Sequence, residues 1–220
     1  MSILRRRLMM ADHYVGGGLL LHLDGINNTG HGHDPNPAVW ADLSGNGHDA
    51  TLTRIVDGDL FGDRYLDGDI VWGEADLGRW VEGATVECVV LAPTGEYPYD
   101  PPDGAIMTPT SLSMDYAVSN WGKSSWIAYS GLGNLNGEYA GRIYYKACSG
   151  DGAPVYLNGV KEPDITVYGG SVRHVQLAHK GDQATRIVRA QIYAVRVYDR
   201  VLSADEVAHN YAVDKARFGL

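Results

Sequence analysis

The stretch RIVRAQIYAVRVYDRVLSADEVAHNYAVDKARFGL (residues 186–220) contains two different hydrophobic patterns in succession. Its first half is a run of β-branched and aromatic residues, which is typical of a strand. Its second half opens with Ser203 and Glu206 at the spacing of a capping box, which predicts the start of a helix. Beyond this cap, three apolar residues recur at near-helical spacing and give the helix one apolar stripe: Val207, Tyr211 and Phe218.

Short apolar runs bounded by glycine, aspartate, asparagine or proline fill most of the remaining chain. These runs are predicted strands at residues 19–23, 85–91, 113–119, 126–130, 141–147 and 172–178. Within PVYLNGVKE (residues 154–162), Asn158 and Gly159 separate two apolar runs, and both residue types accept the positive φ of a type I′ hairpin turn. Many short strands followed by a single helix predict an all-β fold, a sandwich of two antiparallel sheets.

Composition and charge exclude several classes of protein. The 220 residues are 45% apolar, which is enough for the core of a single all-β domain. The formal charge of −9 argues against a nucleic-acid partner, because phosphate neutralisation needs a basic surface. No apolar run approaches the ~20 residues that cross a bilayer, so no membrane span is expected.

The N-terminus is basic, with three arginines at residues 5–7. No apolar segment of signal-peptide length follows them, so we expect no Sec export and synthesis in the cytoplasm. Residues 1–16 are predicted to be a basic tail, and residues 17–220 a single domain.

Four motifs resemble, in the same order, those of bacterial laminin-G-like domains of the concanavalin A-like lectin type. They are WADLSGNGHDATL (residues 40–52), RYLDGD (residues 64–69), VYLNGV (residues 155–160) and the closing strand and helix. The resemblance covers nearly the whole chain and implies a jelly-roll arrangement of the two sheets. ILRRRLMM (residues 3–10) also resembles the openings of phage and prophage tail-region proteins, which implies assembly into a virion or phage-like particle.

Some motif residues have expected structural roles. Trp40 is predicted to be a buried anchor before a tight Asx-type turn at residues 42–46. Arg196 lies on the closing strand and is expected to form a buried ion pair with Asp67 or Asp69.

The resemblance also bears on catalysis. Catalytic members of this superfamily carry E-x-D-x-x-E on one strand, because glycoside hydrolysis needs two carboxylates beside the sugar bond. The nearest acidic cluster here, Asp69, Glu74 and Asp76, does not match that spacing. Cys88 and Cys148 lie in or at the end of predicted strands, where packing is a commoner role than nucleophilic attack. We therefore expect that the chain is not an enzyme but a recognition or adhesion module.

Aromatic residues beside polar ones form the candidate ligand site. Flat rings stack on the C–H surfaces of sugars, while neighbouring polar groups bind the hydroxyls. The candidates are Trp121, Trp126, Tyr129, Tyr139 and Tyr144, with Tyr97 and Tyr99 of the proline-rich segment 92–109. The same rings also suit core packing or cross-strand pairs, because strand alternation turns only about half of them outward.

The expected partner is a surface glycan. The alternative is a structural virion protein, such as a tail or capsid decoration, that binds a neighbouring virion or cell-surface protein and no sugar. A homo-oligomer is compatible with both interpretations.

The polar segment that begins at Asp24 is the candidate metal site. It offers five oxygen ligands of the kind that calcium prefers: Asp24, Asn27, Asn28, Asp34 and Asn36. The alternative is that these residues form Asx turns and bind no ion. His31 and His33, with Asp34, offer a weaker candidate for zinc.

Overall fold

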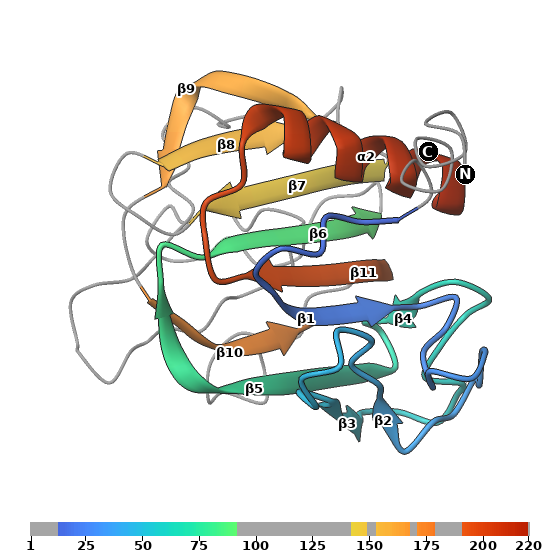
Figure 1. Cartoon of the computed structure of the whole chain (residues 1–220). Coiled ribbons are helices and arrows are strands. Elements are labelled where there is room, and N and C mark those ends of the chain that lie inside the picture. The colour runs from blue at the N-terminus through green and yellow to red at the C-terminus, as the bar shows by residue number, and fades with distance from the viewer. Residues whose placement is uncertain (1–12, 92–141, 149–152, 168–170, 179–190, 220) are drawn as a thin grey trace, which may run out of the picture.

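The computed structural model describes residues 13–91, 142–148, 153–167, 171–178 and 191–219. Within these residues the chain forms two antiparallel sheets with one helix on the outside, which confirms the predicted β-sandwich (Figure 1). The strand connectivity that would define a jelly roll stays a prediction, because residues 92–141 lie outside the described residues. The expected strands at 113–119 and 126–130 lie in that segment.

The larger sheet joins strands that are far apart in the sequence. In the described residues it has seven strands in the order β1-β11-β6-β7-β8-β9, and β4 also pairs with β11. Their bounds are Leu19–Asp24 (β1), Leu66–Asp67 (β4), Thr85–Leu91 (β6), Arg142–Cys148 (β7), Ala153–Leu157 (β8), Val160–Val167 (β9) and Gln191–Tyr198 (β11). The first and last strands of the described chain therefore lie side by side.

The smaller sheet has four strands in the described residues, in the order β10-β5-β3-β2. Their bounds are Val39–Trp40 (β2), Ala50–Arg54 (β3), Val71–Glu82 (β5) and Ser171–Leu177 (β10). Alternate residues of each strand point into the sandwich, so that Ala75 and Leu177 pack with Leu23 and Val195 of the larger sheet in one buried core.

Three local predictions are confirmed. Asn158 and Gly159 join β8 to β9, and both have positive φ, at 49° and 76°. Trp40 is fully buried and donates from Nε1 to the carbonyl oxygen of Asp24 at 3.1 Å. In the turn at residues 42–46, Asp42 accepts the N–H groups of Ser44 and His22, which ties the turn to β1.

The helix α2, Ala204–Phe218, runs across the outer face of the larger sheet (Figure 1). It begins at the predicted capping box, because Ser203 accepts from the Glu206 N–H and Glu206 accepts from the Ser203 N–H. Val207 packs against Tyr156 of β8 and Tyr198 of β11. Phe218 packs at the other end of the helix, so the predicted apolar stripe is the surface that docks.

A buried ion cluster joins this helix to the sheet, and it corrects the expected partners of Arg196. Arg196 binds Glu87 of β6 and Asp214 of α2, at 2.6 and 2.5 Å, and does not pair with Asp67 or Asp69. The register explains the correction, because Arg196 lies directly opposite Glu87, whereas Asp67 lies opposite Gln191 at the start of β11.

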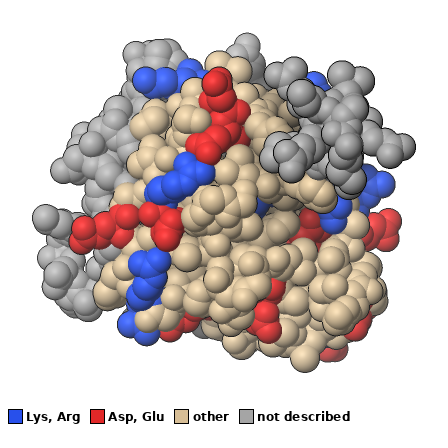
Figure 2. Space-filling view, viewed as in Figure 1, with Lys and Arg blue, Asp and Glu red and all other residues tan. Residues whose placement is uncertain are grey.

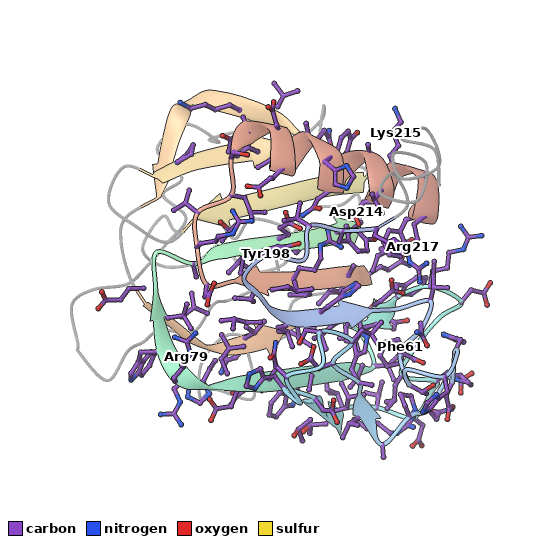
Figure 3. The ribbon with its side chains drawn as sticks, viewed as in Figure 1. Phe61, Arg79, Tyr198, Asp214, Lys215 and Arg217 are labelled. Carbon is purple, nitrogen blue, oxygen red and sulfur yellow. The ribbon has the colours of Figure 1, made fainter. Side chains whose placement is uncertain are left out.

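Neutral side chains complete the cluster. Asn210 of α2 donates to the Glu87 carboxylate and to the hydroxyl of Tyr198, each at 2.9 Å. The ring of Tyr14 covers the Arg196 guanidinium at 3.9 Å from its centroid. Figure 3 labels two members of the cluster, Tyr198 of β11 and Asp214 of α2.

The boundary predicted between the tail and the domain stays a prediction, because residues 1–12 lie outside the described residues. Residues 13–15 contact the helix: the Val15 N–H donates to Asn210, and His209 lies 2.8 Å from the carbonyl oxygen of His13. In the part of the chain that the structure describes, no helix has the length and hydrophobicity needed to cross a membrane.

Candidate functional site

The outer face of the four-stranded sheet carries a half-exposed tryptophan among polar side chains. Trp72, Glu74 and Asp76 alternate along β5 with residues buried in the core, and their partners on β3 and β10 share the outer side. We call this surface the Trp80 face. It comprises Thr51 and Thr53 of β3, Trp72, Glu74, Asp76 and Trp80 of β5, and Arg173, His174 and Gln176 of β10.

A bulge in β5 separates Trp80 from Asp76 on this face. Asp76 lies opposite His174, and Val81 lies opposite Val172, so β5 has residues 77–80 where β10 has only residue 173. Gly78 permits the bulge with φ of +69°, and its N–H donates to Asp76 at 2.8 Å. Trp80 is 42% exposed and Val81 is buried, so beyond the bulge the strand keeps the same inward and outward alternation.

The residue before Trp80 points to a different surface. Arg79, labelled in Figure 3 where β5 curves, pairs with Asp199 beyond the end of β11 at 3.4 Å. Nearby, Arg200 pairs with Glu206 at 2.7 Å. Figure 2 shows acidic and basic groups alternating on this side of the molecule, so its charges largely compensate one another.

Two neighbours from β10 hold the Trp80 indole in place. The edge of His174 meets the ring, with centroids 6.2 Å apart and an interplanar angle of 73°. The Arg173 guanidinium lies 5.9 Å from the ring centroid. Arg173 is itself fixed by two parallel hydrogen bonds to Asp76, at 2.9 and 3.1 Å.

The charges beside the ring are arranged in pairs. The Arg173 hydrogen bonds, with help from the Gly78 N–H, lower the pKa of Asp76 to about 2. Glu74 accepts from the amide of Gln176 at 3.1 Å, and its other oxygen lies 3.1 Å from Nδ1 of His174. The result is a flat apolar ring bordered by carboxylates, a guanidinium and an imidazole, which suits a ligand with one apolar face and several hydroxyl groups.

The aromatic site predicted from the sequence cannot be compared with this surface. Trp121, Trp126, Tyr129, Tyr139, Tyr97 and Tyr99 lie outside the described residues. Tyr144 lies in β7, opposite Val89 of β6, and therefore belongs to the other sheet. Trp80 is not among the residues predicted from the sequence, although the alternation of Trp72, Glu74 and Asp76, continued to residue 80, places it on the same side.

The five predicted calcium ligands lie in one loop whose polar groups already bind one another. Asp24 accepts the N–H of Ile26 with one oxygen and the guanidinium of Arg217, at 2.6 Å, with the other. Asn28 exchanges two hydrogen bonds with the backbone of Asp34, at 2.7 and 2.9 Å.

The other two residues behave in the same way. Asn27 accepts the Gly32 N–H at 2.7 Å, and Asn36 donates to Asp59 and accepts from Arg54. These bonds account for the loop as a set of Asx turns without an ion. Calcium binding stays a prediction.

The residues proposed for zinc are not gathered into a site. His33 lies against the carbonyl oxygen of Gly25 at 3.0 Å, whereas His31 is exposed. Throughout the described ranges, no three His, Cys, Asp or Glu side chains lie close enough together to hold a metal ion.

Comparisons with known proteins identify the fold. No protein-family model matches the sequence, and no curated protein matches it. Domain 4 of AbnA, a GH43 extracellular arabinanase from Geobacillus stearothermophilus, was solved with arabinotriose. It matches with a TM-score of 0.50 and 18% identity, over 88% of this chain and 98% of that chain.

Two other matches are more partial. Trypanosoma rangeli sialidase with sialic acid has a TM-score of 0.47 and 13% identity, over 90% of this chain and 33% of the sialidase. The binding domain of botulinum neurotoxin DC with rat synaptotagmin II has a TM-score of 0.47 and 8% identity, over 90% of this chain and 52% of that one. The chain thus spans about one third of the length of the sialidase, and identities this low show a shared β-sandwich fold alone.

The expectation that the chain is not an enzyme is corrected. Sialidases, including a mutant displaying trans-sialidase activity, are among the structures that match this chain over part of their length. The expectation was wrong because the absence of one carboxylate motif excludes only the reaction that uses that motif. At TM-scores below 0.5, these matches bring neither a reaction nor catalytic residues to this chain.

Proposed function

We propose that the protein is a recognition module that binds a carbohydrate on the Trp80 face. The observation that carries this proposal is the half-exposed indole of Trp80, held by His174 and Arg173 and bordered by hydrogen-bonding side chains. A sugar ring has the complementary shape, because its C–H groups form an apolar face and its hydroxyls project from the edge.

The match to domain 4 of AbnA supports this proposal. That domain has the same fold over 98% of its length and was solved in complex with arabinotriose, a short oligosaccharide. The fold alone does not specify a ligand, and the residues of the Trp80 face supply the argument for a sugar.

The wider setting expected from the sequence is part of the proposal. Assembly into a phage-like particle rests on the resemblance of residues 3–10 to phage tail-region proteins. None of the matches named above is called a phage or laminin G protein. The alternative, a virion component that binds only protein, predicts that no sugar binds.

The test begins with a glycan array probed with the purified full chain, followed by titration of the bound sugars. Trp80→Ala should weaken binding at least ten-fold, about 1.4 kcal/mol, because it removes the apolar platform. Arg79→Ala is the matched control, since Arg79 lies on the same bulge but pairs with Asp199 outside the face. The proposal fails if no glycan binds, or if Trp80→Ala binds as tightly as the wild type.

A further inference from the structure

We infer that the carbohydrate bound on the Trp80 face is uncharged, and that carboxylated, sulfated or phosphorylated sugars are excluded. This inference rests on the proposed function and specifies its ligand class. It follows from the way in which the charges beside Trp80 are already paired.

Among the described residues, the guanidinium of Arg173 is the cation that lies beside the Trp80 ring, and Asp76 engages it. An acidic sugar is best held by the two parallel donors of an arginine. In Arg173 those donors, Nε and Nη2, are directed at the two oxygens of Asp76, at 2.9 and 3.1 Å. The pKa of Asp76, lowered to about 2, keeps its carboxylate charged at neutral and mildly acidic pH, so the pair persists in both conditions.

The second carboxylate makes the face unfavourable for an anion. Glu74 and Asp76 occupy successive outward positions of β5, and Arg173 offsets only one of their charges. Two donors on β10, His174 and Gln176, are directed at Glu74. An incoming carboxylate would meet like charge, and the formal charge of −9 on the whole chain adds to the repulsion.

The same groups favour hydroxyls. A carboxylate oxygen has acceptor capacity beyond one hydrogen bond, so Glu74 and Asp76 can each accept from a sugar hydroxyl. The two bonds to Asp76 leave Nη1 of Arg173 to donate to a hydroxyl oxygen. A neutral sugar can therefore stack on Trp80 and satisfy these groups without breaking the Arg173–Asp76 pair.

The experiment compares neutral sugars with acidic ones, and the trisaccharide pair below is matched in size and linkage. Lactose is titrated against sialyllactose, and a galactose trisaccharide against the galacturonic acid trisaccharide of the same linkage, with arabinotriose as a further neutral probe. The full chain is used at pH 7 and low salt, and binding is followed by the NMR signal of the Trp80 indole N–H, assigned with Trp80→Phe. We expect the neutral member of a pair to bind at least ten-fold more tightly than the acidic member.

A charge variant tests the mechanism. Asp76→Asn frees the Arg173 guanidinium and removes one negative charge, so it should reduce the preference for the neutral sugar at least three-fold. Thr53→Ala is the control, because it changes an uncharged residue of the same face. A preference that Asp76→Asn leaves unchanged overturns the mechanism.

The outcomes separate this inference from the proposed function. If acidic sugars bind as tightly as neutral ones and Trp80→Ala abolishes both, the inference is overturned and the proposed function stands. If no sugar perturbs the Trp80 signal and none is found on the array, the proposed function fails and the inference fails with it.

Discussion

Replacing Arg196 with methionine should destabilise the fold severely, because it removes the one guanidinium that serves two buried carboxylates. Arg196 donates to Glu87 at 2.6 Å and to Asp214 at 3.0 and 2.5 Å, and all three side chains are fully buried. Removing one partner of a buried ion pair costs about 3–5 kcal/mol, because the remaining charge has no compensation. With two carboxylates left, we expect the upper part of that range, against a total stability of about 5–15 kcal/mol for a typical domain.

Asp214→Asn should cost far less. Burial raises the pKa of Asp214 above its ordinary value, because it outweighs the opposing effect of Arg196. The charged form of this carboxylate is therefore less favourable in the folded protein than in water. Asparagine keeps an oxygen acceptor for Arg196, and Glu87 still neutralises the guanidinium, so we expect a loss of about 1 kcal/mol. Arg79→Met is the surface control, and it should cost about 0–1 kcal/mol because its pair with Asp199 is exposed.

Urea unfolding at pH 7, followed by tryptophan fluorescence and circular dichroism, measures these differences. If Arg196→Met does not fold, the expected order of the remaining variants still tests the argument. Stability of Arg196→Met within about 1 kcal/mol of the wild type would refute the reasoning. So would an Asp214→Asn variant that is as unstable as Arg196→Met.

Two further predictions concern pH and calcium. Burial, followed by the charge of Arg196, lowers the pKa of His22 to about 4, whereas an unfolded histidine titrates near 6.5. As the pH falls from 6.5 to 4, the unfolded state gains a proton that the folded state does not, so the free energy of unfolding should decrease by up to about 3 kcal/mol. The variant His22→Gln should show a smaller decrease over the same pH range, and urea titrations at each pH measure both. If the loop from Asp24 to Asn36 binds calcium, millimolar calcium should raise the melting temperature. At a hundredfold excess of calcium over Kd, the free energy of unfolding should increase by about 2.7 kcal/mol. Asp34→Ala should abolish that rise, and a melting temperature insensitive to both calcium and chelator rejects the site.

The features predicted well from the sequence are those that neighbouring residues determine. The capping box at Ser203 and Glu206 and the hairpin at Asn158 and Gly159 each satisfy a local requirement of the backbone, and both are present. The two sheets also follow from local alternation, because a residue that points inward is apolar whichever strand lies beside it.

The partners of Arg196 could not be predicted in this way, because they depend on strand register. Asp67 was a reasonable choice, since β4 does pair with β11, but it lies at the opposite end of that strand. The useful signal was Glu87, a lone charge in the apolar run of β6, because a charge in a buried strand requires a partner.

Trp80 was missed for a related reason. Strict alternation along β5 places residue 80 on the same side as Asp76, but only if the strand continues past Gly78 and Arg79. A glycine often interrupts a strand, so residue patterns near Trp80 do not reveal that β5 continues to Glu82, which pairs with Ser171 of β10.

The two outer surfaces of the sandwich have different roles, and this difference explains why binding is assigned to the smaller sheet. On the larger sheet, α2 covers Tyr156, Tyr198 and the buried cluster around Arg196, so a ligand there would have to displace the helix. On the smaller sheet, Trp80 is 42% exposed and Arg173 forms an exposed ion pair with Asp76, and the contribution of such exposed groups to folding is small. Trp80, Arg173 and Asp76 can therefore change with little loss of stability, whereas changes under the helix break the fold. A surface that tolerates substitution is one on which ligand specificity can vary.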